Sequence, residues 1–404
     1  MRTIVRSVRF LLMAMLSLVA WAIQAEPGKG AHSGPWMISP YVQESGTYDS
    51  NIDQAPSNGR DDYFLTSEVG ARAAYSVRML DCTALGFGSY RNYSDATEKD
   101  FGAYGESVSA KYGLREQVEV QADEAFRHVQ DNDTHGSDTA IGGISAESVL
   151  DAATQSKRNV AHGGVSVGRD VTDKVALDLG YSFDSVRYDA AGLANLDGHA
   201  GLLEGSYLVT DKSAIFAAAF GGVQENSIMA GSAKYYGSRL GAKTHGTDLV
   251  TIKAGAGLQQ YDRPASLGSD STAFNFDGEA TWALTEKVSL RAGGKNGTQM
   301  SSVLASNPSQ FHVAWGGAVY KVLPTTSLSL NTMYRIDEYV DPVTLADGTL
   351  GTRTDKGTGV SGRADYQTPK SFLSLYAEAS YQKTDSNVSK SDDTRISVGA
   401  NLKY

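Results

Sequence analysis

The chain of 404 residues has one cysteine, nine prolines and no long apolar run apart from the one at its N-terminus. Because Cys82 is alone, an intramolecular disulfide is excluded and other forces must hold the fold. No stretch beyond residue 23 is long and apolar enough for a membrane helix. The formal net charge of −10 argues against nucleic-acid binding and against a polybasic membrane-surface role.

The N-terminus has the pattern of an export signal. Arg2, Arg6 and Arg9 precede an apolar run at residues 10–23, and Ala25 provides a cleavage point before Glu26. An uncleaved anchor is the alternative, but the run is short for a span and no stop-transfer cluster follows. The sequence therefore predicts a signal peptide at 1–25. Residues 26–35, with three glycines and two prolines, are predicted to form a mobile periplasmic arm.

The rest of the chain is rich in glycine and tyrosine, with 43 and 21 residues, which favours strands joined by turns. Apolar and polar residues alternate from end to end, which is the pattern of strands with one apolar and one polar face. In the last strand Ile396, Val398 and Leu402 oppose Arg395 and Lys403. Such strands fit a sandwich or a membrane barrel, but a sandwich of this length would need several domains with linkers, and none is evident.

The connections between these strands alternate in length. Short turns are predicted at 78–79, 113–116, 172–173, 211–212, 244–246, 285–286, 324–326 and 369–370. Longer polar loops include 50–62, 131–156, 263–271, 301–310, 341–356 and 384–393. Eight turns and nine loops predict an all-β fold at 36–404: a transmembrane antiparallel up-and-down β-barrel of about 18 strands, with periplasmic turns and extracellular loops. Sixteen strands remain possible, because 80–93, 101–112 and 233–240 alternate poorly.

The polar faces of these strands supply candidates for the wall of a channel. Acidic and basic residues on this face nearly balance, so no ion filter of one sign is predicted. Most of them are expected to pair across neighbouring strands and stiffen the wall. The loop at 131–156 is the predicted constriction, with a flexible surface loop as the alternative. The pore-lining candidates are Glu68, Arg72, Asp178, Asp277, Glu279, Arg291, Arg335, Asp337, Arg363 and Glu378.

Signals of catalysis and of metal binding are poor. The seven histidines are scattered, and none has the spacing of a metal ligand with a cysteine or a carboxylate. No nucleophile elbow, P-loop or dinucleotide-binding glycine pattern occurs in its proper context. His128 and His135 lie near acidic residues, as rim residues of barrel proteases do, but solvated side chains explain them better. The sequence predicts no enzyme, no cofactor and no metal.

One segment resembles a known family. Residues 38–42 (ISPYV) lead to 46–52 (GTYDSNI), and Asp62, Tyr63 and Phe64 follow a polar loop. This resembles the opening of the beta-barrel porin 2 family, outer-membrane proteins often associated with exopolysaccharide systems, whose first hairpin carries a similar Tyr-Asp-x-Asn element. The resemblance spans most of the mature chain and is weakest at 226–245. It implies about sixteen to eighteen strands and supplies no catalytic residues.

The family resemblance implies passage of a secreted polysaccharide for some members, alongside a periplasmic export protein. The leading hypothesis is therefore an outer-membrane channel for an exopolysaccharide. The alternatives are a general or small-solute diffusion porin and a structural or adhesive surface barrel. The expected partners are outer-membrane lipid, polysaccharide or small hydrophilic solutes, and the barrel assembly machinery through the C-terminal strand.

Overall fold

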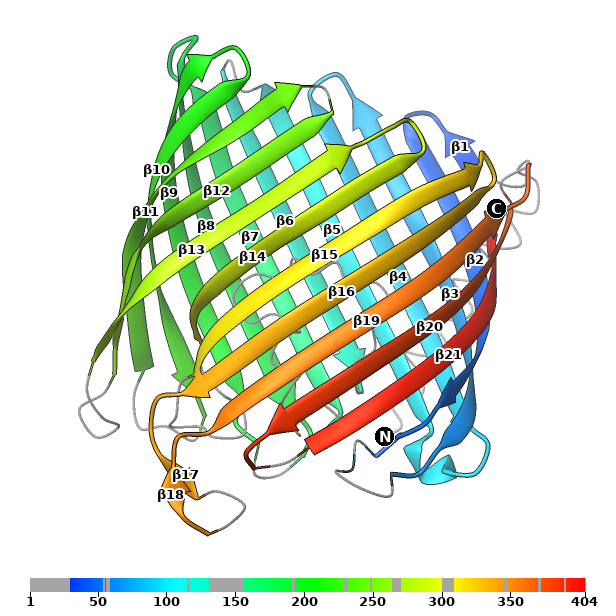
Figure 1. Cartoon of the computed structure of the whole chain (residues 1–404). Coiled ribbons are helices and arrows are strands. Elements are labelled where there is room, and N and C mark those ends of the chain that lie inside the picture. The colour runs from blue at the N-terminus through cyan, green and yellow to red at the C-terminus, as the bar shows by residue number, and fades with distance from the viewer. Residues whose placement is uncertain are drawn as a thin grey trace.

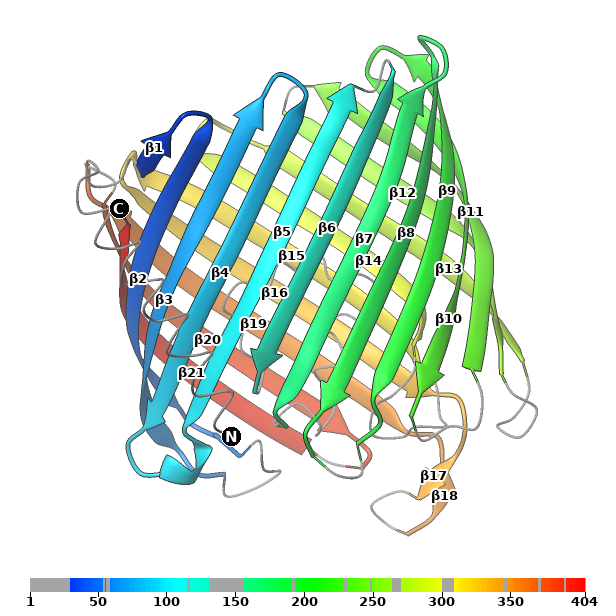
Figure 2. The same ribbon diagram turned by 180° about the vertical axis from the view of Figure 1, so that it is seen from behind.

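The computed structural model describes residues 30–53, 55, 59–114, 117–130, 156–190, 193–227, 232–247, 249–263, 270–299, 309–344, 348–369, 372–388 and 390–403. The predicted signal peptide lies outside the described residues. Figure 1 and Figure 2 show the two sides of one closed barrel of tilted strands. No described helix is long and apolar enough to cross a membrane.

Eighteen long strands form the barrel wall, each antiparallel to its neighbours. The first nine are β2 (Trp36–Asp49), β3 (Asp62–Val77), β4 (Leu80–Tyr93), β5 (Phe101–Leu114), β6 (Val118–Val129), β7 (Arg158–Asp170), β8 (Val175–Tyr188), β9 (Leu196–Thr210) and β10 (Ser213–Asn226). The other nine are β11 (Ser232–Thr247), β12 (Val250–Asp262), β13 (Ser271–Ala283), β14 (Val288–Gln299), β15 (Ser309–Leu323), β16 (Thr326–Tyr339), β19 (Thr354–Gln367), β20 (Leu373–Ser386) and β21 (Lys390–Lys403).

Pairing of β2 with β21 closes the barrel, from Tyr41↔Lys403 to Asp49↔Arg395. The predicted up-and-down topology and the count of eighteen are confirmed, and the alternative of sixteen is wrong. The poorly alternating segments form β4, most of β5 and half of β11. β11 keeps a continuous register with β10 from Ser232 to Thr244. The family resemblance is weakest at 226–245, yet the part of this segment in β11 is an ordinary strand of the wall.

A short strand, β1 (Ala31–Ser33), lies within the segment predicted to be a mobile arm. It pairs with the start of β2, from Ala31↔Ile38 to Ser33↔Trp36. β21 reaches only as far as Tyr41 on that edge of β2, so β1 occupies the edge that β21 leaves open. This part of the arm is therefore fixed to the barrel by ladder hydrogen bonds, because an unpaired edge would expose backbone groups.

The two ends of the barrel differ in their connections. Short turns lie at the end that also holds β1 and the C-terminus, called the turn end here, and longer connections lie at the opposite loop end (Figure 1). β17 (Val343–Thr344) and β18 (Leu350–Gly351) form a hairpin that projects from the loop end, and η1 (Thr97–Lys99) lies between β4 and β5. Two predicted boundaries were wrong. β11 continues through 244–246, and the connection predicted at 384–393 is only 387–389, because the ladder extends further at both places.

The outer face of the wall is apolar and exposed. Leu240, Leu330 and Tyr63 have exposed fractions of 72%, 55% and 62%, and they belong to a set of large apolar side chains found around the whole barrel. Tyr63 packs against Tyr48 near the loop end in a tilted arrangement, with centroids 4.9 Å apart, and Trp36 packs against Tyr75 in the same way near the turn end, at 4.8 Å. A broad apolar surface with aromatic residues at both edges fits a hydrocarbon layer and its two interfaces.

Candidate functional site in the barrel lumen

The strand register places all ten predicted pore-lining residues on one face of the sheet. That face is the concave one. Lys253 on β12 lies 3.9 Å from Glu204 on β9, three strands away, and such a contact is possible only across the inside of the curve. The alternation in the sequence therefore separates inner from outer residues on the strands that carry the ten candidates.

The inner faces of β13 to β16, β19 to β21 and β2 line a hollow of about 880 Å³. Four of the ten candidates border it: Glu279, Arg291, Arg363 and Glu378. Amide, hydroxyl and aromatic side chains lie between the charges, among them Gln43, Asn331, Ser361, Trp315, Tyr376, Ser380 and Gln382. This side of the lumen is a polar wall on which no single charge dominates.

Several charges of the wall are paired with a neighbour. Arg363 lies 2.8 Å from Asp365 and 3.3 Å from Glu378, and its guanidinium stacks 4.1 Å above the centroid of Tyr376. Asp277 is 2.8 Å from Arg239. Such pairs neutralise the local field and hold long side chains against the wall.

The remaining candidates differ in their exposure. Glu68 is buried and accepts a hydrogen bond of 2.8 Å from the Tyr41 hydroxyl, whereas Arg72 is exposed and Asp178 is half-buried. Arg335 and Asp337 lie on the inner face but are almost completely buried, joined by two hydrogen bonds of 2.6 and 2.7 Å. These two residues therefore belong to the packed part of the lumen rather than to its open surface.

Burial of the inner face increases toward the loop end. Ile52 and Ala96, from the β2–β3 and β4–β5 connections, pack against Phe64 and Tyr93 on the inner wall. Both connections therefore turn into the barrel there. A second buried cluster lies on the inner face of β8, β9, β11 and β12, and it consists of Val186, Leu196, Ala233 and Tyr261. The described structure narrows at the loop end, while the predicted constriction at 131–156 lies, apart from Ser156, outside the described residues.

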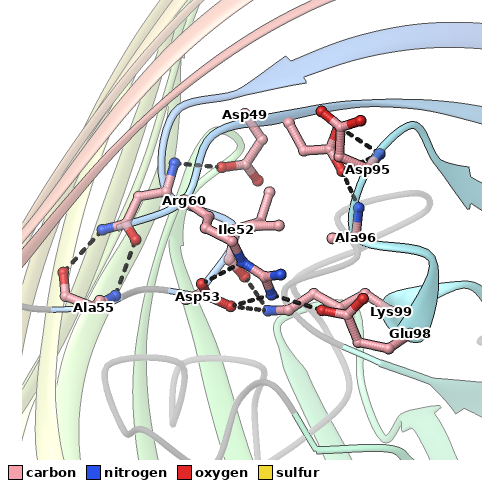
Figure 3. A network of polar contacts seen from close by, with 11 residues as sticks. Asp49, Ile52, Asp53, Ala55, Arg60, Asp95, Ala96, Glu98 and Lys99 are labelled. Carbon is pink, nitrogen blue, oxygen red and sulfur yellow. Dashed lines mark hydrogen bonds and ion pairs between the residues drawn. The ribbon is translucent and has the colours of Figure 1, made fainter. Parts of the chain in front are cut away.

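A polar network joins the two inward-turning connections (Figure 3). Asp53 accepts a hydrogen bond of 3.0 Å from Arg60 and lies 2.7 Å from the Lys99 ammonium. Arg60 also contacts Glu98 at 2.8 Å, and Lys99 donates to the Ile52 carbonyl at 2.6 Å. The hydrogen bond from Arg60, with Lys99 as second partner, lowers the pKa of Asp53 to about 2. The network is thus ionised at neutral pH and fixes the two connections to each other.

One inner-face cluster was not recognised in the sequence. The imidazole of His162 lies between two carboxylates, with Nδ1 2.7 Å from Asp184 and Nε2 2.8 Å from Asp123. The three residues come from β7, β8 and β6, so only the register of three strands brings them together. Among the described residues no group of three or more such side chains is arranged to hold a metal ion.

The sequence matches the family described as "Putative beta-barrel porin 2" over residues 26–212 and 220–404, and the chain belongs to that family. It is an outer-membrane, porin-like β-barrel, and porins are channels rather than enzymes. No curated protein sequence matches the chain.

Several solved porins resemble the barrel in structure. The BenF-like porin of Pseudomonas fluorescens Pf-5 has a TM-score of 0.48 and 12% identity, covering 91% of this chain and 99% of that one. OccAB4 of Acinetobacter baumannii has a TM-score of 0.48 and 10% identity, covering 91% and 98%. OpdK of Pseudomonas aeruginosa, solved with vanillate, has a TM-score of 0.45 and 12% identity, covering 91% and 99%. At such identities the likeness extends to the fold alone.

Proposed function

We propose that the barrel passes a secreted exopolysaccharide across the outer membrane. The observation that carries this proposal is the wall of the 880 Å³ hollow, where paired charges alternate with amide, hydroxyl and aromatic groups. A hydrated sugar chain can exchange water for such groups at little cost, whereas an ion filter needs unbalanced charge. Passage is passive, and the driving force comes from polymer synthesis or from a periplasmic partner.

The proposal includes the export of the chain and its insertion into the outer membrane. Residues 1–25 act as a cleaved signal peptide, and the C-terminal strand β21 is read by the barrel assembly machinery. The turn end then faces the periplasm and the loop end faces the outside. A periplasmic export protein would deliver the polymer to the turn end, where Arg72 and Arg291 are exposed.

Diffusion of small solutes is the second candidate function. It is favoured by the inward-turning connections at the loop end, where Ile52 and Ala96 occupy part of the inner wall. A narrow opening suits small molecules better than a polymer, unless the connections move. OpdK was solved with vanillate, an example of a small solute in a porin. A structural or adhesive barrel is the third candidate, and steady single-channel current from the purified protein would argue against it.

Deletion of the gene tests the proposal. We expect loss of surface polysaccharide and accumulation of polymer in the periplasm, both restored by a plasmid copy of the wild-type gene. The matched control is a plasmid copy with Leu330→Val, a change on the lipid-facing side that leaves the lumen intact. Normal surface polysaccharide in the deletion strain, together with slower uptake of small hydrophilic solutes, would favour the diffusion porin instead.

A further inference from the structure

Aromatic rings on the inner face lie over glycines of the neighbouring strand. Among the described residues eight such pairs occur, and in each the ring and the glycine are direct register partners. A Cβ atom placed on any of these glycines would come within 3.0 Å of ring atoms. The pairs are Tyr41–Gly70, Phe87–Gly105, Phe216–Gly241, Phe220–Gly237, Tyr235–Gly222, Phe311–Gly297, Trp315–Gly293 and Tyr376–Gly399.

The pattern has a structural reason. A glycine weakens a strand because it offers no side chain to pack, and a ring from the paired residue covers the exposed backbone. A ring that lies along the wall also leaves more of the bore open than one that projects into it. All eight pairs lie on the inner parity, so the wall combines aromatic surface with a wide lumen.

The pairs differ in what covers the other side of the ring. Cations stack over several of them, with Lys253 5.4 Å from the centroid of Phe216 and Arg239 5.3 Å from that of Phe220. Within the described chain no cation or ring stacks on Trp315. Its indole covers Gly293 and also lines the hollow. The face of the ring that is turned away from Gly293 therefore borders open space in the lumen.

Planar polar groups line the same hollow as this indole. Arg291 donates a hydrogen bond of 3.0 Å to the side-chain oxygen of Asn331 across β15. Gly317 makes this bridge possible, because a Cβ there would lie 2.8 Å from that same oxygen. Glu279 is the register partner of Gly293, and it lines the same hollow as Arg291 and Asn331. An aromatic face therefore lies beside a guanidinium, an amide and a carboxylate.

We propose that Trp315, Arg291, Asn331 and Glu279 form a subsite that binds a pyranose ring of the polymer. The inference rests on the proposed function and names the part of the wall that carries it. A pyranose presents a face of C–H groups, which suits stacking on an indole, and a rim of hydroxyls, which suits planar hydrogen-bonding side chains. The subsite binds weakly enough to release each sugar, as repeated passage requires.

Current block in planar bilayers tests the subsite. The probes are a β-1,4-linked and an α-1,4-linked glucose hexamer, with a polyethylene glycol of equal hydrodynamic size as the non-stacking control. We expect Trp315→Ala to shorten the dwell time of at least one hexamer by about tenfold, the effect of losing one stacking contact, and to leave the glycol unchanged. Phe220→Ala is the matched control. It also removes a ring that covers a glycine, but the other face of that ring is already covered by Arg239.

Tryptophan fluorescence gives an independent measurement that needs neither current nor a change at Trp315. Trp21 lies in the proposed signal peptide, so the substitutions Trp36→Phe and Trp282→Phe leave Trp315 as the sole tryptophan of the mature chain. We expect either hexamer to shift its emission saturably and the glycol to leave it constant. Constant emission with both hexamers, or equal dwell times for wild type and Trp315→Ala, would overturn the subsite.

The two proposals fail separately. Hexamer binding that depends on Trp315, in a protein whose deletion leaves surface polysaccharide normal, would retain the subsite and remove the exopolysaccharide as its cargo. Loss of polysaccharide on deletion, with full export by Trp315→Ala and no hexamer binding, would retain the channel and remove the subsite.

Discussion

The pair Arg335–Asp337 offers a sharp test of burial inside the barrel, because the wall contains a near copy of it. Arg335 and Asp337 are 2.6 Å apart, with side-chain exposed fractions of 1% and 4%. Arg363 and Asp365 have the same spacing along the chain and lie 2.8 Å apart, but both are 38% exposed. The two pairs share their charges and their spacing, and they differ in solvent access and in Glu378, a second carboxylate that lies 3.3 Å from Arg363.

Removing one partner should cost very different amounts at the two places. Arg335→Ala or Asp337→Ala leaves a charge that water cannot reach, and breaking a buried pair costs about 3–5 kcal/mol. Arg363→Ala or Asp365→Ala leaves a charge that water solvates, so the pair should be worth about 0.2–1 kcal/mol. In double-mutant cycles, the coupling energy of the buried pair should exceed that of the exposed pair by about 1 kcal/mol or more.

Unfolding by guanidinium in detergent micelles, followed by tryptophan emission and by the heat-dependent shift in gel mobility, measures these free energies. The two pairs lie on the neighbouring strands β16 and β19. Equal coupling energies would refute the reasoning, because they would mean that water reaches Arg335 as freely as Arg363. A large change in conductance with unchanged stability would place the pair on the open channel surface instead.

Three further predictions follow from the two faces and from the loop-end network. Leu330→Arg, on the lipid side, should destabilise the barrel by about 2–4 kcal/mol, whereas Ser327→Arg, on the inner face opposite an aspartate, should stay within about 0.5 kcal/mol in the same unfolding assay. Gly241→Leu should cost about 1–3 kcal/mol, because its side chain would collide with the Ala254 carbonyl and with the Phe216 ring, and unchanged stability would contradict that packing. The hydrogen bond from Arg60 depresses the folded pKa of Asp53 to about 2, below 3.8, so its stabilisation is complete above pH 3.8 and is lost as the pH falls through about 2. Hydrogen exchange of the β2–β3 connection, corrected for intrinsic rates, should rise over that interval and already be fast at neutral pH in Asp53→Asn.

Much of the wall could be predicted because the period of a strand is two. Alternation alone assigned Glu68, Arg291 and Glu378 to the face that became the lumen, and it requires only local backbone geometry. The same signal was weak in β4, where Ala84, Gly86 and Gly88 stand on the outer face, and in β11, where Lys234 and Ser238 do. Whether these segments form strands depended on hydrogen-bond pairing with the neighbouring strands. The alternation of residues along the sequence does not reveal that pairing.

Contacts between distant segments could not be predicted. The burial of Arg335 depends on what the rest of the chain places above the inner face, and the network of Asp53 and Lys99 joins two connections that are separate in sequence. β1 illustrates the same limit. Its few residues have the composition of a free arm, yet β2 offers them an open edge, because β21 ends before it.

By itself, the sequence determined the class of fold and the direction in which each side chain of a clear strand points, since both follow from local periodicity and from the lengths of the connections. Only the tertiary structure decided which glycine lies beneath which ring, which charges are sealed from water, and where the lumen narrows. Those features depend on the register of neighbouring strands and on the closure of the sheet, and these are set by hydrogen-bond pairing between residues far apart in the chain.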